Sequence, residues 1–416
     1  MGRFMSRFIK IAALTLAVSL CAGLLCACGD DTEQTVIPAD YGTYGADIAR
    51  QLAGTYSNRT AYSQGEQQAG EFVQQAMKDL GYEPQVQTFT NSSGLASNNY
   101  VVKIEGTGFY SEGADGSYSL GRKIAVIGAH YDAAMRSDLT GSTFDGISDN
   151  ASGVGCLLTA LAQASSYKKM GFDVYYVAFG AGTDSYAGAN AFLNSLSVED
   201  RSNVEVMYCI DSIYAGDKVY ASAGYNSLVP GSKYAMRRKL YQTYDVCYAN
   251  TLYSTYGFDI LYNESGIETD LNGDGNADIY NEVSANKSDY VPFDDAGIPI
   301  VFFDSYDYNF ESMDEMKDTK NLTLQDYGGA VRSTPLDSTS ILDAALRTED
   351  TDEDGDGVTD KSGDVLQIRI NAIAFVIMET LMKGSEDGMT PDEYQTYINN
   401  PTESTLESGV TETTAD

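Results

Sequence analysis

Hydrophobic and polar positions along the chain follow two periods, which predicts a mixture of helices and strands. Apolar residues recur every three or four positions between Gln64 and Leu80, as on one buried face of a helix. Two further helices are predicted at Ala151–Ala164 and at about Val365–Met382. Short apolar runs of strand length lie between them, at Tyr100–Ile104, Lys123–Ala129, Asp173–Phe179, Val204–Ile210 and Ile298–Phe303. This alternation predicts a three-layer α/β domain.

The first 27 residues are predicted to be an export signal. Arg3, Arg7 and Lys10 form a positive region, and an apolar run of residues 11–25 follows. The sequence Leu-Cys-Ala-Cys, ending at Cys28, is similar to a lipobox, in which Cys28 would carry the lipid. We therefore expect a protein anchored to the outer face of a bacterial membrane, with residues 28–40 as a tether. The alternative is a plain signal anchor, for which the apolar run is short.

Charge narrows the choice of partners. The chain has 60 acidic and 26 basic side chains and a formal net charge of −34, so phosphate backbones and anionic lipid surfaces would repel it. We expect no nucleic-acid partner, and membrane contact only through Cys28. The folded domain is predicted at 41–385, and the acidic segment 386–416 is predicted to be disordered. Cys156, Cys209 and Cys247 lie among apolar or aromatic neighbours and are predicted to be buried thiols.

Candidate chemistry follows the ends of the predicted strands. One strand runs into His130, the only histidine in the chain, and Asp132 lies two residues further on. The strand that ends at Ile210 is followed by Asp211, and Asp149 precedes a predicted helix. Open α/β sheets bind ligands at the carboxyl ends of their strands, so these side chains are expected to meet at one edge. Asp132 could accept the second ring proton of His130 and so fix its tautomer.

Five short motifs resemble those of a known family, in matching order and spacing. They are Gly-Ala-His-Tyr-Asp (128–132), Asp-Asn-Ala-Ser-Gly (149–153), Val-Ala-Phe-Gly-Ala (177–181), Ser-Asp-Tyr (288–290) and Ala-Gly-Ile-Pro (296–299). The chain resembles the co-catalytic zinc exopeptidases, metallopeptidase family twenty-eight, which includes secreted aminopeptidases, glutamate carboxypeptidase II and glutaminyl cyclase. The resemblance covers nearly all of Tyr41–Met382. It implies a central, mostly parallel mixed sheet flanked by helices, and peptides or peptide-like molecules as ligands.

The resemblance also implies a site with two metal ions, of which this chain keeps one half. His130 and Asp211 match the ligands of one ion, and Asp149 matches the aspartate that bridges both. Asp132 matches the carboxylate that orients the histidine. These matches imply a single zinc ion held by His130, Asp149 and Asp211. A hydrogen-bonded polar cluster without metal is an equally weighted alternative.

The other half of that site departs from the family pattern. Gly182 stands where the family has its general base, and Thr183 and Tyr290 stand where it has ligands of the second ion. A general base usually contributes about 100- to 10,000-fold in rate, and glycine cannot accept a proton. Asp184 is the one neighbour that could substitute as base. Glutaminyl cyclase activity is disfavoured, because the ligands which that enzyme keeps correspond to Asp149, Thr183 and Tyr290.

Two further motifs predict calcium. Both read Asp-x-Asx-x-Asp-Gly-x-x-Asp, in which oxygens at alternate positions converge on a hard cation. They lie in predicted insertions at 270–282 and 352–364, with ligands Asp270, Asn272, Asp274, Asp278, Asp352, Asp354, Asp356 and Asp360. The glutamate usual at position twelve is absent from both. The alternative is a pair of acidic surface turns.

Three functions remain open from the sequence. The first is an impaired peptidase homologue that binds peptides in an inherited cleft, lined in part by Tyr131, Tyr186 and Tyr290. The second is an active exopeptidase that releases terminal residues with one metal ion and a substitute base. The third is a calcium-braced structural module. Gly182 and Thr183, together with Tyr290, favour the first over the second.

Overall fold

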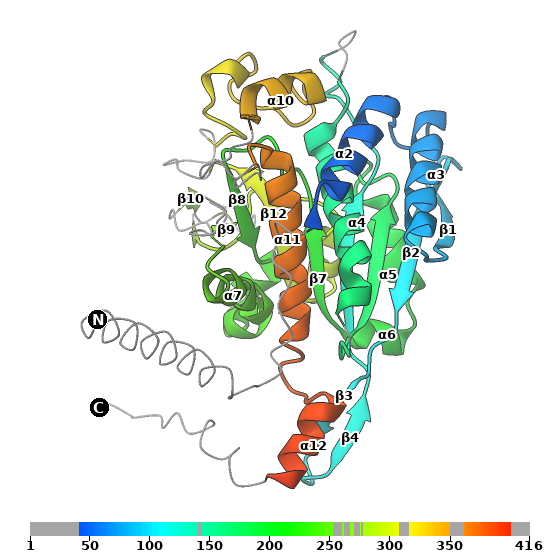
Figure 1. The fold of residues 1–416 in the computed structure, drawn as a ribbon, viewed down its shortest axis with the longest axis vertical. Coiled ribbons are helices and arrows are strands. Elements are labelled where there is room, and N and C mark those ends of the chain that lie inside the picture. The colour runs from blue at the N-terminus through cyan, green and yellow to red at the C-terminus, as the bar shows by residue number, and fades with distance from the viewer. Residues whose placement is uncertain are drawn as a thin grey trace, which may run out of the picture. The chain divides into compact units, whose positions relative to one another are not determined.

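The computed structural model describes residues 41–400, apart from 140–143, 168, 253–259, 262–266, 270–274, 276–277, 308–315 and 350–361. Its centre is one mixed sheet of eight strands (Figure 1). In sheet order these are β1 (Gln85–Thr90), β2 (Ala96–Ile104), β6 (Asp173–Phe179), β5 (Ile124–His130), β7 (Val204–Ile210), β12 (Ile300–Tyr306), β8 (Lys218–Ser222) and β9 (Ile260–Leu261).

The middle of the sheet is parallel and its flanks are partly antiparallel. The strands β6, β5, β7 and β12 pair in parallel, whereas β1 with β2, β2 with β6, and β12 with β8 are antiparallel. All seven residues of β5 are buried, as are six of the seven in β6, β7 and β12. Strands covered on both faces need apolar residues at nearly every position, so these runs were readable from the sequence.

Helices cover both faces of this sheet. One face carries α2 (Tyr44–Thr55), α3 (Gln64–Asp79), α4 (Gly153–Gln163), α7 (Lys233–Ala249) and α11 (Val365–Met382), with α4 and α11 in contact (Figure 1). The other face carries α5 (Ala187–Ser195) and α9 (Val291–Asp295), and short helices α6 (Val198–Ser202) and α10 (Thr339–Leu346) lie in connections. The predicted three-layer arrangement with a mostly parallel mixed sheet is confirmed.

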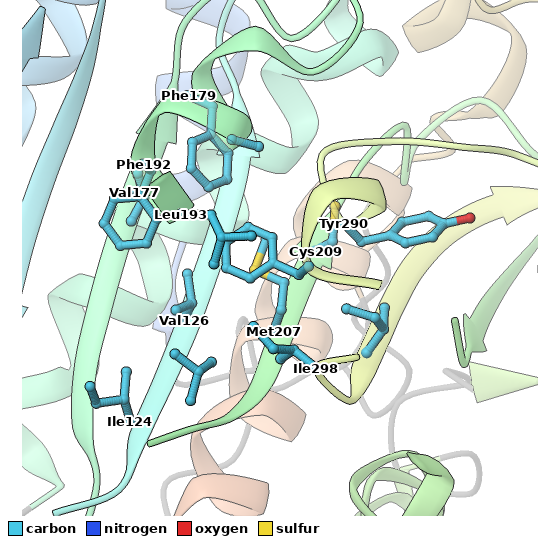
Figure 2. Close-up of a cluster of buried hydrophobic side chains, with 14 of the residues drawn as sticks. Ile124, Val126, Val177, Phe179, Phe192, Leu193, Met207, Cys209, Tyr290 and Ile298 are labelled. Carbon is cyan, nitrogen blue, oxygen red and sulfur yellow. The ribbon is translucent and has the colours of Figure 1, made fainter. Parts of the chain in front are cut away.

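The core on the α5 side joins strands and helices that are distant in sequence. Phe192 and Leu193 of α5 pack with Val126, Met207 and Phe293. Figure 2 shows several of these side chains meeting between the ribbons. Burial of this many large apolar groups is the main stabilising contribution to the fold, at about 1.5–3 kcal/mol for each fully buried side chain. The predicted buried thiols belong to the core as well: Cys156, Cys209 and Cys247 are buried and form no disulfide within the described part of the chain.

The segment after residue 385 departs from the prediction. Helix α12 (Pro391–Asn399) forms there, and it begins with a capping box made by Thr390 and Glu393. The helix packs on a hairpin of β3 (Phe109–Glu112) and β4 (Tyr118–Gly121). The rings of Tyr110 and Tyr394 stack with centroids 4.1 Å apart. The prediction of disorder is therefore wrong for this part of 386–416, because aromatic packing offsets the polar composition.

The predicted calcium loops fall mostly outside the described residues. Asp270, Asn272 and Asp274, together with all four predicted ligands of the second loop, lie there. A short hairpin of β10 (Ile267–Thr269) and β11 (Asp278–Tyr280) flanks the first loop, and Asp278 is the first residue of β11. Cys28 and the predicted export signal also lie outside the described residues.

Candidate metal centre

Three buried side chains converge at the carboxyl edge of the parallel strands. His130 is the last residue of β5, Asp211 directly follows β7, and Asp149 lies in the turn Ile147–Ser152 before α4. The His130 Nε2 atom is 3.3 Å from Asp149 Oδ1 and 3.6 Å from Asp211 Oδ2. Strands β5 and β7 are parallel neighbours, so their ends bring His130 and Asp211 to the same place. The expected meeting of these residues is observed.

Asn150 ties the turn that carries Asp149 to the end of β7. Its side-chain amide donates to the Ile210 carbonyl oxygen at 2.8 Å, and its Oδ1 accepts from the backbone N–H groups of Gly153 and Ser212. The peptide bond between Asp149 and Asn150 is cis. This network holds Asp149 beside Asp211 although 62 positions separate Ser212 from Asn150.

Asp337 holds the same turn from the other side. Its carboxylate accepts from the backbone N–H groups of Ser148 and Asp149, at 2.7 and 3.0 Å. Burial raises the pKa of Asp337 well above its usual value, and the charge of Asp149 adds to the shift. The sequence analysis missed this residue, since no motif marks an aspartate that binds backbone from a distant loop.

Arg59 connects the loops that carry the candidate ligands, and it was also missed. It is fully buried, and its guanidinium donates to the carbonyl oxygens of Tyr131 at 2.8 Å, Gly146 at 2.6 Å and Asp145 at 2.5 Å. Hydrogen bonds from a buried charged donor are worth about 1.5–3 kcal/mol each. Arg59 therefore braces the segment after β5 against the turn before α4.

Electrostatics in the cluster favour a charged histidine when no ion is present. Burial by itself would lower the pKa of His130, but hydrogen bonds to Asp132, Asp149 and Asp211 raise it well above 6.5. Burial would raise the pKa of Asp211, yet the charge of Arg332 and the hydrogen bond with His130 lower it. The proton on His130 thus occupies a position that a cation could take instead.

The three residues also fit a zinc ion geometrically. Tetrahedral zinc with bonds of about 2.0–2.2 Å places neighbouring ligand atoms about 3.3–3.6 Å apart. The two distances from His130 Nε2 match that separation, and the ligand atoms of all three residues lie within 4.8 Å of one another. The His130 Nδ1 atom faces Asp132, at 3.3 Å from its Oδ1 and 3.1 Å from its carbonyl oxygen. This arrangement leaves Nε2 free to bind metal.

Gly182 and Thr183, the positions predicted to lack the general base and a metal ligand, make other contacts in the structure. Gly182 donates to Asp132 Oδ1 at 2.8 Å, and a Cβ atom built on it would lie 2.4 Å from the Cβ of His130. A glutamate base therefore has no room at residue 182 unless His130 moves. Thr183 is exposed, and its Oγ1 donates to Asp132 Oδ2 at 2.6 Å. Its hydroxyl serves Asp132 and does not belong to the cluster of three.

Tyr290 lies in the apolar core. It is 1% exposed, its ring packs on Phe302 with centroids 4.9 Å apart, and its hydroxyl donates to the Asn286 carbonyl oxygen. Figure 2 shows its hydroxyl directed away from the other labelled side chains. Tyr131 is also 1% exposed, so the prediction that these two tyrosines line an open cleft is wrong. Tyr186 is half-buried.

Asp184, the suggested substitute base, is exposed. Its carboxylate accepts a hydrogen bond from the Tyr62 hydroxyl at 2.8 Å. A base must lie within hydrogen-bond reach of the water that it activates. Among the described residues, His130, Asp149 and Asp211 lie close enough together to share a metal ion, and Asp184 is not part of that cluster.

Two more buried carboxyl groups surround the centre. Glu66 of α3 accepts from Ser97 and from the Ala181 backbone N–H, and burial raises its pKa to about 7. Asp289 accepts no hydrogen bond from the described residues, and burial raises its pKa to about 7 despite the nearby His130. Ser63 and Glu66 form the Ser-x-x-Glu pattern of a capping box, which could have revealed Glu66. Asp289 lies inside the Ser-Asp-Tyr motif.

A model of peptidase family M28 matches residues 114–334, more than half of the chain. The chain belongs to peptidase family M28. This M28 protein is 21% identical to the alkaline phosphatase isozyme conversion protein of Escherichia coli over 318 residues, which cover 73% of this chain and 84% of the relative. The family and the resemblance predicted from the sequence are thereby confirmed.

Solved structures support the same fold for this M28 protein. The Acidobacteriales bacterium glutaminyl cyclase aligns with a TM-score of 0.54 and 15% identity, over 86% of this chain and 99% of that one. The Porphyromonas gingivalis glutaminyl cyclase gives 0.52 and 16%, over 82% and 97%. A Zn-dependent exopeptidase of Parabacteroides distasonis gives 0.51 and 14%, over 84% and 98%.

Proposed function

We propose that this protein is an exported, lipid-anchored M28 homologue that binds peptides and in which hydrolysis is impaired or lost. The observation that carries the proposal is the contact between Gly182 and His130. A Cβ at residue 182 would lie 2.4 Å from the Cβ of His130, which supports the view that this position has no room for the glutamate that serves as general base in the family. Thr183 donates a hydrogen bond to Asp132, and Tyr290 is buried in the core with its hydroxyl bonded to a backbone carbonyl. Because neither is available as a ligand for a second ion, these contacts support one metal ion at most.

Zinc would be held by His130, Asp149 and Asp211. It would supply a Lewis acid that polarises a carbonyl oxygen of a bound peptide. Asp132 orients His130 through Nδ1, and Asn150 with Asp337 holds Asp149 in place. Gly182 offers no side chain that could accept a proton from water, so zinc held at this centre would assist peptide binding more than hydrolysis.

The rival function is an active exopeptidase with one metal ion and Asp184 as base. Purified protein, loaded with zinc, is incubated with aminoacyl-nitroanilides and with short peptides whose cleavage is followed by mass spectrometry. We expect no cleavage above a metal-free control, and peptide binding detected by saturation-transfer NMR. The proposal is contradicted if the wild-type protein cleaves the substrates robustly and Asp184→Asn abolishes this cleavage. The exposed control Asp295→Asn should leave it unchanged. Absence of both cleavage and binding contradicts the proposal too.

The anchoring part of the proposal rests on Cys28 and on the apolar run before it. We expect a labelled fatty acid to be incorporated into the full chain expressed in a bacterial host, and no incorporation into the Cys28→Ala variant. The matched control is Cys26→Ala, which removes the neighbouring cysteine and keeps Cys28. Label that remains in Cys28→Ala would contradict lipidation at this residue.

A further inference from the structure

A half-buried arginine, Arg332, lies on a segment beside the candidate metal centre. The backbone N–H groups of Val331 and Arg332 donate to Asp318 Oδ2, at 2.7 and 2.9 Å, which fixes the backbone at this point. The next residue, Ser333, places its Oγ 3.5 Å from Asp149 Oδ2. The segment that carries Arg332 is therefore in contact with a candidate metal ligand.

Hydrogen bonds within the described part of the chain do not account for the position of two nitrogen atoms of the Arg332 guanidinium. Its Nε and Nη2 atoms are buried and make no hydrogen bond to the residues that the structure describes. Burying nitrogen atoms of a cation without such bonds is unfavourable unless negative charge lies close by. Burial by itself would lower the pKa of Arg332, but the charges of four carboxyl groups raise it, namely Asp211, Asp318, Asp149 and Asp304. Opposite charge is therefore what stabilises Arg332 in this place.

The charge of Arg332 bears on how many ions the centre can hold. Asp149 and Asp211 are two buried carboxylates, at 7% and 4% exposure, and a single divalent ion near them would share their charge with Arg332. The residues that would bind a second ion are engaged elsewhere, as described for Thr183 and Tyr290. A fixed positive charge takes up part of the negative potential that attracts cations.

We propose that Arg332 supplies the second positive charge of this centre, so that it restricts the centre to one divalent ion and lowers the affinity for that ion. The inference rests on the one-metal site of the proposed function. It adds a named residue that sets metal affinity without being a ligand. Arg332 is thus a positioning and charge-balancing residue rather than a catalytic one.

The test compares zinc binding by the whole chain and by variants at residue 332. Arg332→Met removes the charge and keeps an apolar stem of similar length, whereas Arg332→Lys keeps the charge. Affinity is measured at one fixed pH by competition with a chromophoric zinc chelator, in calcium excess to saturate the predicted calcium loops. Stoichiometry is measured by elemental analysis after gel filtration. His130→Ala in each background shows that the ion counted is the one in this centre.

We expect one zinc per wild-type chain and an affinity for zinc that rises on the order of tenfold or more in Arg332→Met. Arg332→Lys should stay near the wild-type affinity, and so should the control Arg136→Met, which removes an exposed arginine paired with Asp138. Arg332→Gln replaces Arg332→Met if circular dichroism shows that the methionine variant does not fold.

The outcomes separate this inference from the proposed function. Unchanged zinc affinity in the charge-removing variant overturns the role of Arg332 and leaves the peptide-binding proposal standing. Two ions bound by the wild-type chain overturn both. If neither the wild-type chain nor Arg332→Met binds zinc, the inference is overturned. Peptide binding is then decided by its own NMR experiment.

Discussion

At the residue scale, Gly182 and Thr183 shape the loop beside the candidate metal centre. Both donate their backbone N–H groups to Asp132, at 2.8 and 3.1 Å, so the loop after β6 is built around that carboxylate. Hydrogen bonds from His130 and Thr183 lower the pKa of Asp132, although burial by itself would raise it. The residue types at 182 and 183 were readable from the sequence. Their contacts were not, since they depend on how β5 and β6 end side by side.

A pair of substitutions tests the contact at residue 182. Gly182→Glu should destabilise the protein by about 3 kcal/mol or more, because its Cβ would overlap atoms close to the His130 backbone. Thr183→Glu, at the exposed neighbouring position, should cost less, about 1.5–3 kcal/mol, through the lost hydrogen bond to the Asp132 carboxylate. Urea denaturation followed by circular dichroism measures both. Equal stability of the two variants would show that residue 182 has more room than the structure gives it.

Asp289 should make stability depend on pH. Its pKa is raised from 3.8 to about 7 in the folded state, so the native protein keeps a proton that the unfolded chain releases. The free energy of unfolding should therefore fall between about pH 4 and 7, by on the order of a few kcal/mol. Asp289→Asn should remove this loss and be more stable than wild type at pH 8, with little difference at pH 4.

Denaturation of metal-free protein at several pH values checks this expectation. Asp295→Asn, at an exposed position of α9, is the matched control and should keep the wild-type pH dependence. If Asp289→Asn follows the wild-type curve at every pH, Asp289 is not the group responsible.

At the scale of elements, the predicted strands and helices agree well with those observed, and the exceptions have packing reasons. Val365–Met382 was predicted as a helix and is α11. Its 18 residues have a mean hydropathy of 1.6, high enough to span a membrane, yet 67% of them are buried inside the fold. Helix α11 is apolar because it is surrounded by protein. Helix α12 was missed because only three of its nine positions are even half-buried, so its sequence has a weak apolar face.

Two truncations test the contribution of α12. A chain ending at residue 385 should lose about 2–4 kcal/mol of stability, because Phe109, now 1% exposed, and the stacked ring of Tyr110 would lose their cover. A chain ending at residue 400 should match the full protein in melting temperature. Differential scanning calorimetry and limited proteolysis of the β3–β4 hairpin provide the measurements. Equal melting of both truncated chains would mean that α12 adds no stability.

At the scale of the whole molecule, net charge governs how ions act on stability. A chain with formal charge −34 repels itself, so any added cation stabilises it to some degree. Binding at a specific site adds to that general effect, because a ligand that binds only the folded state stabilises it by about 2.7 kcal/mol at a hundred times its Kd. Calcium at the two predicted loops would act in this second way.

Removal of calcium with a chelator should therefore lower the melting temperature of the protein by a few degrees at constant ionic strength. Magnesium and sodium salts at matched ionic strength separate the specific effect from the general one. Asp352→Ala with Asp354→Ala should remove part of the calcium response, and Asp270→Ala with Asp274→Ala another part. No response to calcium beyond that to the matched salts would contradict both predicted sites.

The sequence alone determined the family, the layer order and the identity of three candidate ligands, because those features depend on local periodicity and on residue types at strand ends. Only the tertiary structure decided which further charged side chains surround the centre. Arg59, Asp337, Asp289 and Arg332 reach it from segments distant along the chain, and no local pattern records such contacts. Tyr290 shows the same limit, since a motif position that predicts a ligand became part of the core once Phe302 packed against it.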